Sequence, residues 1–195
     1  MTDATATTPG VSTDVVPHSA DGPHSAAGAA GAAGAAPAVR AVTAATDDAM
    51  RALGRDLAAL ARAGDVLLLS GPLGAGKTTL TQGLGEGLRV RGSVTSPTFV
   101  ISRIHPSLVG GPDLVHVDAY RLGGPAEIDD IDLDMTQPDS VTVVEWGEGV
   151  AEGLADDRLE IRIERHHDDT RTVHLRAVGA RWNDIDLPGA QPGLG

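Results

Sequence analysis

The sequence predicts an α/β fold in which a mostly parallel sheet is flanked by helices and ends in a C-terminal antiparallel hairpin. Between residues 46 and 146, apolar residues at helical spacing alternate with short apolar runs, the pattern of strands joined by helices. Two of the later runs end in an acidic residue. From Leu159 onward the pattern changes to strict alternation, which is typical of strands with one solvated face.

The first predicted element is an amphipathic helix. Thr46 or Asp47 can cap its start, and Gly64 can end it. Its apolar face consists of residues at helical spacing, namely Met50, Leu53, Leu57 and Leu60. A single helix packed on a sheet accounts for this pattern.

A strand, a glycine-rich loop and a second helix follow. The run "DVLLLS" (65–70) is short and apolar on both faces, as in a buried parallel strand. It leads directly into "GPLGAGKT" (71–78). After the loop, a leucine recurs every four residues, at Leu80, Leu84 and Leu88, which indicates a helix.

Two further runs, "LVHVDAY" (114–120) and "SVTVVEW" (140–146), suit buried parallel strands.

The hairpin comes last. Leu159, Ile161 and Ile163 alternate with Glu160, Arg162 and Glu164, and "TVHLRAV" (172–178) alternates likewise. We interpret the charged residues as a solvated face. His166 and His167 beside Asp168 and Asp169 are better explained as a polar hairpin turn than as a metal site, because no further ligand spacing supports coordination.

The chain divides into three parts. Residues 1–38 are rich in Ala and Gly and offer little apolar surface, so we expect a disordered extension. Residues 39–182 form the folded domain, and residues 183–195 form a second disordered tail. The absence of cysteine, of a signal peptide pattern and of any apolar run near the roughly 20 residues that span a bilayer predicts a cytoplasmic protein without a membrane partner.

Net charge limits the choice of partner. A formal charge of −12 disfavours direct binding to nucleic acid phosphates, which depends on clustered Lys and Arg. Any nucleic acid would therefore be held mainly by a partner protein.

The loop "GPLGAGKT" carries the strongest functional signal. It fits the phosphate-binding pattern G-x-x-x-x-G-K-[ST], and it contains the one lysine of a chain with 14 arginines. Lys77 is predicted to reach the β and γ phosphates of a nucleotide, and the Thr78 hydroxyl to face Mg²⁺. The predicted nucleotide-binding residues of the loop are Gly71, Leu73, Gly74, Ala75, Gly76, Lys77, Thr78 and Thr79.

Two acids and a threonine are candidates for the catalytic part of the site. Asp118 and Glu145 each end a predicted strand, where a nucleotide hydrolase needs carboxylates for metal and water. Ordinary strand-end acids are the alternative, and sequence reasoning leaves open which of the two would touch the metal. Thr98, in "SPTF" (96–99), lies where a switch segment would come, although a simple strand entry explains it equally well.

The absence of a guanine-recognition signature bears on which nucleotide the loop would bind. The guanine-recognition signature Asn-Lys-x-Asp cannot exist here, because the one asparagine is Asn183 and the one lysine is in the loop. ATP is therefore favoured over GTP. A small-molecule kinase and a binding module that ATP merely switches remain as alternative functions.

Four motifs in order, "GPLGAGKTTL", "SPTF", "HVDAYRL" and "VVEWGE", resemble the bacterial TsaE (YjeE) ATPases over roughly residues 45 to 178. The resemblance implies a P-loop domain that binds ATP and Mg²⁺, hydrolyses slowly alone, and acts with the TsaB–TsaD heterodimer in threonylcarbamoyladenosine modification of tRNA. It implies that tRNA is reached only through that complex.

The resemblance also implies residue roles. Thr78 and Glu145 would be metal ligands, Asp118 the essential acid and Thr98 the switch threonine. Trp146 would lie beside the nucleotide, and Arg171 would approach it. One departure is Met50, which stands where family members often have threonine and so puts the expected contacts to adenine in question.

Overall fold

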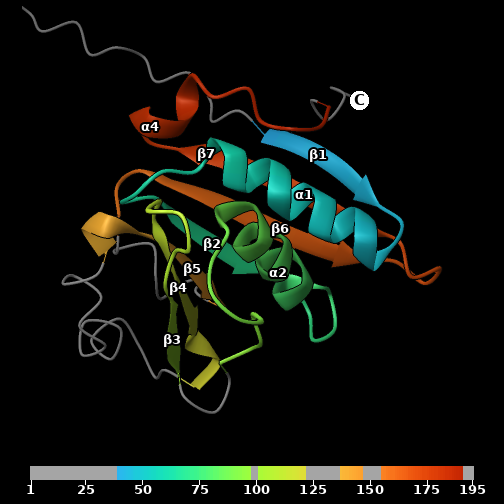
Figure 1. Cartoon of the computed structure of the whole chain (residues 1–195). Coiled ribbons are helices and arrows are strands. Elements are labelled where there is room, and N and C mark those ends of the chain that lie inside the picture. Colours follow the sequence, from blue (N-terminus) through green and yellow to red (C-terminus); the bar gives the residue numbers. More distant parts are fainter. Residues whose placement is uncertain (1–38, 98–100, 122–136, 147–154, 191–195) are drawn as a thin grey trace, which may run out of the picture. The chain divides into compact units, whose positions relative to one another are not determined.

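A single mixed sheet organises the molecule, and it is described here from a computed structural model (Figure 1). The structure describes residues 39–97, 101–121, 137–146 and 155–190, all of them within the compact unit Ala36–Gly195. Within these residues the sheet has seven strands in the order β1-β7-β6-β2-β5-β4-β3. Their bounds are β1 Val39–Ala44, β2 Val66–Ser70, β3 Ser102–His105, β4 Asp113–Asp118, β5 Ser140–Glu145, β6 Arg158–Arg165 and β7 Arg171–Val178.

The prediction of a mostly parallel sheet is corrected by this topology. The central strands β6, β2, β5 and β4 are parallel, but β1, β7 and β3 add three antiparallel pairings to the three parallel ones. The sequence pattern does not predict β1 or β3, because both are edge strands whose residues are mainly half-buried or exposed. The C-terminal antiparallel hairpin, β6 with β7, is confirmed.

Two long helices, α1 (Asp47–Leu60) and α2 (Lys77–Leu88), lie side by side against one face of the sheet (Figure 1). Thr46 caps α1, since its hydroxyl oxygen accepts a hydrogen bond from the Ala49 N–H at 3.1 Å. The predicted first helix and its cap are thus confirmed. The short elements are η1 (Ala119–Arg121), η3 (Gln137–Asp139) and α4 (Ala180–Asn183).

Strands β2, β4 and β5 are buried on both faces, as their continuous apolar runs predict. On the helix side, Leu67 and Leu69 of β2 join a large core with α1, α2 and the hairpin. On the opposite side, Val66 and Leu68 pack with residues of β4 and β5. Parallel strands covered on both faces need this double burial, and it positions the ends of β2, β4 and β5 firmly.

The two helices approach each other through glycines. A Cβ on Gly54 of α1 would overlap the carbonyl oxygen of Leu80, and one on Gly83 of α2 would overlap the carbonyl oxygen of Arg51. Because backbone atoms cannot move aside as a flexible side chain can, these positions need glycine. The close approach holds α2, and therefore the loop that precedes it, against α1.

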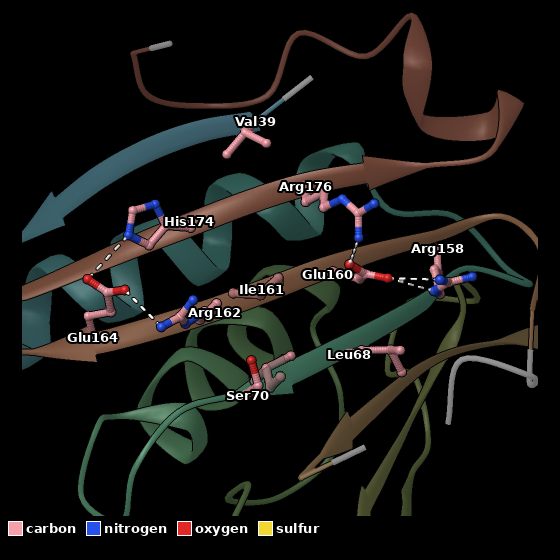
Figure 2. A pocket seen from close by; sticks show the side chains of 11 residues that line it. Val39, Leu68, Ser70, Arg158, Glu160, Ile161, Arg162, Glu164, His174 and Arg176 are labelled. Atoms are coloured by element: carbon pink, nitrogen blue, oxygen red, sulfur yellow. Dashed lines mark hydrogen bonds and ion pairs between the residues drawn. The ribbon is translucent and has the colours of Figure 1, made fainter. Parts of the chain in front are cut away.

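The hairpin has the predicted solvated face. Leu159, Ile161 and Ile163 are fully buried, while the intervening charged residues are half-buried or exposed. Figure 2 shows Glu160 between Arg158 and Arg176, and Glu164 between Arg162 and His174. Residues 166–170 form the polar turn that the sequence predicts, with the His166 N–H donating to the Thr170 carbonyl.

The segment after β7 packs on the domain up to residue 190. Arg181 forms a buried ion pair with Asp65 at 2.8 Å and donates to the Leu60 carbonyl. Leu187 is buried, and Ala190 pairs with Ala41 of β1. The predicted tail of residues 183–195 therefore includes residues packed on the domain, because the side chains of Ile185 and Leu187 contact the core and the backbone of Ala190 bonds to Ala41. Residues 191–195, and the predicted extension at 1–38, lie outside the described residues.

Among the described helices, none combines the length and apolar character needed to cross a membrane.

The glycine contact between the helices can be tested with Gly83→Ala. Alanine favours an isolated helix by about 1 kcal/mol over glycine, yet here we expect a loss of about 1–3 kcal/mol in the free energy of unfolding, because the new methyl overpacks against backbone. Chemical denaturation measures this change. Ala59→Gly, at an exposed position of α1, is the control for propensity alone. A more stable Gly83→Ala protein would contradict the close contact.

Candidate functional site

The glycine-rich loop, residues 71–76, joins the end of β2 to the start of α2. Helix α2 begins at Lys77 directly after the loop, so its free N–H groups and the positive end of its dipole face the space above the loop. Gly71 has φ of 144°, and a Cβ there would come within 2.5 Å of the Ile163 carbonyl oxygen of β6. Only glycine fits this turn, and the result is a backbone cradle suited to phosphate oxygens.

Lys77 is enclosed by the loop that it follows. Its side chain is buried, and its ammonium donates to the carbonyl oxygens of Gly71 at 2.8 Å and Pro72 at 3.1 Å. The same ammonium lies 3.8 Å from the centre of the Trp146 ring, within cation–π distance. Burial lowers the pKa of Lys77, and the nearby carboxylates of Glu145 and Asp118 oppose that shift.

The two predicted acids lie side by side. Strands β4 and β5 are parallel neighbours, and Asp118 pairs with Glu145 in their register. Both carboxylates are buried, at the carboxyl ends of their strands. The Asp118 carboxylate accepts a hydrogen bond from the Tyr120 N–H at 3.0 Å.

Glu145 connects the acids to the loop. One of its oxygens, Oε1, accepts a hydrogen bond from the Thr78 hydroxyl at 3.0 Å. The same oxygen lies 2.8 Å from Nε2 of His116. Thr78, 67 residues away in sequence, is therefore in direct contact with the acid that the resemblance implies as its fellow metal ligand.

These groups line one pocket of about 460 Å³. The pocket contains most of the predicted site residues, namely Leu73, Gly74, Ala75, Gly76, Lys77, Thr78, Thr79, Asp118, Glu145, Trp146 and Arg171. Gly71 is not among the lining residues, but its carbonyl oxygen accepts a hydrogen bond from Lys77. Thr98 falls outside the described residues, whereas Ser96 two positions earlier lines the pocket.

Trp146 has an unusual backbone conformation. Its φ is +62°, in the left-handed region that a bulky residue seldom adopts. Its N–H donates to the Leu69 carbonyl of β2 at 2.9 Å, and its ring packs against Tyr120 with centres 5.3 Å apart. Strained backbone of this kind tends to occur where a side chain must be aimed at a ligand, and here it aims the ring over Lys77.

Arg171 and Asp47 also line the pocket. The Arg171 guanidinium pairs with the Asp47 carboxylate at 3.2 Å, and its buried Nε has no hydrogen-bond partner among the described residues. Met50 does not line the pocket; it is buried beneath Gly76. Met50, where the sequence departs from the family, is thus part of the core. Asp47, one turn earlier on α1, lines the pocket instead.

Three residues of the site, Asp47, Ser96 and His116, are not among the site residues that the sequence predicts. The sequence predicts Asp47 only as a helix cap and Ser96 only as part of the segment around Thr98. It places His116 in an apolar strand, although His116 stands two residues before Asp118 and so shares its face of β4. That spacing was the available signal for His116.

The donor set suits a divalent cation held together with a phosphate ligand. Thr78 offers a hydroxyl and Glu145 and Asp118 offer carboxylates, the oxygen ligands that Mg²⁺ prefers. In the part of the chain that the structure describes, no group of three or more His, Asp or Glu side chains forms a metal cage. Mg²⁺ commonly keeps several waters and uses substrate phosphates with one or two carboxylates, so the residues present fit such an ion.

A second pocket, of about 510 Å³, lies on the outer face of β1, β7, β6 and β2 (Figure 2). Its charged side chains are already engaged, since Glu160 accepts from Arg158 and Arg176 while Glu164 pairs with Arg162 and His174. Because these opposite charges neutralise one another, this face has less to offer an anionic ligand than the loop has.

Comparisons with known proteins agree on one family. The family model "Threonylcarbamoyl adenosine biosynthesis protein TsaE" matches residues 44–173, a range that contains every lining residue of the loop pocket. The tRNA threonylcarbamoyladenosine biosynthesis protein TsaE of Streptomyces coelicolor is 63% identical over 143 residues, covering 71% of this chain and 97% of the relative. The protein of the same name from Bacillus subtilis is 42% identical over 133 residues, covering 68% of this chain and 82% of the relative.

A solved structure is also similar. The crystal structure of Bacillus subtilis YdiB superposes with a TM-score of 0.63 at 34% identity, covering 76% of this chain and 92% of that one. The α/β architecture with its mixed sheet is therefore shared with a protein of known structure.

The contact between Lys77 and Trp146 predicts a spectroscopic signal. A nucleoside triphosphate should draw the ammonium toward its phosphates and so change the fluorescence of Trp146, because the charge 3.8 Å from the ring moves. Titration of the protein with a triphosphate would measure this. The chain has two tryptophans, so Trp182→Phe, which removes the one far from the pocket, should keep the response. A response that persists in Trp146→Phe would refute this arrangement.

Proposed function

The chain belongs to the TsaE family, and from this premise we propose that it is a Mg²⁺-dependent P-loop ATPase serving threonylcarbamoyladenosine modification of tRNA. The observation that carries the proposal is the contact between Thr78 of the loop and Glu145 at the end of β5. It brings a hydroxyl and a carboxylate together beside the buried ammonium of Lys77. A metal–nucleotide complex needs these three groups within a few ångströms of one another.

Each residue has a role in this proposal. Lys77 stabilises the negative charge of the β and γ phosphates, after exchanging its loop carbonyls for phosphate oxygens. Thr78 and Glu145 hold Mg²⁺, which supplies charge neutralisation for the phosphates. Asp118 is the essential acid and orients water or metal-bound groups, and Thr98 is the switch threonine. Trp146 and Arg171, which both line the pocket, enclose the nucleotide.

The partners in the proposal are the TsaB and TsaD proteins. We assign the transfer of the threonylcarbamoyl group to their heterodimer, and to this chain the ATP hydrolysis that permits repeated turnover in the cytoplasm. The charge of −12 supports this division, since an acidic protein has little affinity of its own for tRNA phosphates. tRNA is then reached only through the complex.

The loop lysine gives the first test. Lys77→Ala should lower the rate of ATP hydrolysis about 10²–10³-fold, since it removes one preorganised donor to the developing charge. Phosphate release measured with and without TsaB–TsaD checks this, and wild-type activity should be weak alone and higher with the heterodimer. Arg62→Ala is the control, because it also removes one positive charge, but at an exposed position outside the pocket. This variant should hydrolyse ATP at the wild-type rate.

Other outcomes of the same assay decide between the functions. Undiminished hydrolysis in Lys77→Ala would show that the loop is not the active site. Rapid phosphate transfer to a small acceptor without any partner would favour a kinase. Nucleotide-dependent binding to TsaB–TsaD with no hydrolysis at all would favour a switched binding module.

Depletion of the protein tests the pathway. Cells that lack it should lose threonylcarbamoyladenosine from their tRNA, because the transferase complex would stop after its first turnovers. Mass spectrometry of tRNA nucleosides measures the modified base directly. Complementation with wild type should restore it, and complementation with Lys77→Ala should not. An unchanged level of the modified base after depletion would exclude the pathway while leaving the ATPase activity open.

A further inference from the structure

A buried histidine holds the carboxylate of Glu145. His116 of β4 is fully buried, and its Nε2 lies 2.8 Å from Oε1 of Glu145, which is also buried. The contact joins two neighbouring strands, since His116 pairs with Val143 in the register of β4 and β5. Both side chains point to the helix side of the sheet, His116 two residues before the end of β4 and Glu145 at the end of β5.

The surroundings of the imidazole assign its hydrogen. Nδ1 of His116 is buried and has no hydrogen-bond partner among the described residues. A hydrogen on Nδ1 alone would be buried without an acceptor, and a bare Nε2 would then face a carboxylate oxygen, lone pair against lone pair. The hydrogen therefore belongs on Nε2, which donates to Glu145.

The two donors to Glu145 converge on the same oxygen. Oε1 accepts from the Thr78 hydroxyl and from His116, whereas the described residues offer Oε2 no hydrogen bond. Two donors from different directions fix the rotation of a carboxylate more firmly than one does. They leave Oε2 as the oxygen available to a ligand in the pocket that Glu145 lines.

We propose that His116 is a positioning residue, which holds Oε1 of Glu145 so that Oε2 is presented to the divalent cation of the bound nucleotide. The inference rests on the proposed function, because it takes Glu145 as a metal ligand. It goes beyond that function in assigning separate tasks to the two carboxylate oxygens and in giving the histidine of β4 a part in metal binding. Residues outside the ligand set that orient a ligand typically change metal affinity about 10–100-fold when they are removed.

The chain offers matched variants for the test. His116→Gln keeps an amide N–H at about the reach of Nε2, while His116→Asn has the same amide on a shorter side chain that ends near Nδ1. His116→Leu removes the donor. His105→Leu is the control, because His105 is also a buried histidine, on the adjacent strand β3, and it does not contact Glu145.

The main readout is the affinity for ATP measured by calorimetry with Mg²⁺ and with EDTA, which needs no hydrolysis. In His116→Leu and His116→Asn we expect the enhancement of ATP affinity by Mg²⁺ to fall about 10–100-fold, with affinity in EDTA near that of wild type. His116→Gln should recover most of the enhancement. His105→Leu should leave the enhancement unchanged.

The outcomes separate the inference from the proposed function. If wild type binds Mg²⁺–ATP but His116→Asn and His116→Gln show the same enhancement as wild type, the positioning role is wrong. The positioning role is also wrong if His116→Gln loses as much of the enhancement as His116→Asn does, because the two variants differ only in the reach of the amide donor. If His116→Leu does not fold, the Gln and Asn pair decides. If wild type binds no ATP under either condition, the proposed function itself fails.

Discussion

The parallel pairing of β5 with β2 on one side and β4 on the other is the constraint on which the site depends. In this register Leu69 lies beside Glu145 and Glu145 beside Asp118, so the loop after β2 and both acids emerge at one edge. A slip of one residue would turn Glu145 to the opposite face, because side chains alternate along a strand. Burial of these strands on both faces makes such a slip costly.

Burying an ammonium and two carboxylates together is the electrostatic problem that this register creates. Desolvation disfavours each charge, and it lowers the pKa of Lys77 while Glu145 and Asp118 oppose the shift. The protein compensates with local hydrogen bonds to neutral groups: the Lys77 ammonium donates to loop carbonyl oxygens, and Glu145 accepts from the Thr78 hydroxyl. Because these partners are uncharged, they do not neutralise Lys77 or the carboxylates of Glu145 and Asp118. The three charges therefore remain available to a phosphate and its cation.

The sequence predicts the parts of this site that depend on local patterns. The loop motif, the capped helix at Thr46 and the acids at the ends of β4 and β5 were all recognisable, because spacing and burial pattern fix them within a few residues. The edge strands β1 and β3 were not, since half-buried strands lack a strong alternation. Leu187 was hidden in a polar segment, and its burial depends on contacts made at long range.

The role of His116 shows why the rest could not be read from the sequence. Its partner Glu145 is 29 residues away, and only the register of β4 and β5 brings the two together. The choice of residue then has a physical reason. An arginine or lysine at this place would orient Glu145 equally well, but its permanent charge would neutralise the carboxylate and repel an incoming cation. An imidazole with one N–H orients the carboxylate and leaves its negative charge for the cation that we propose binds there.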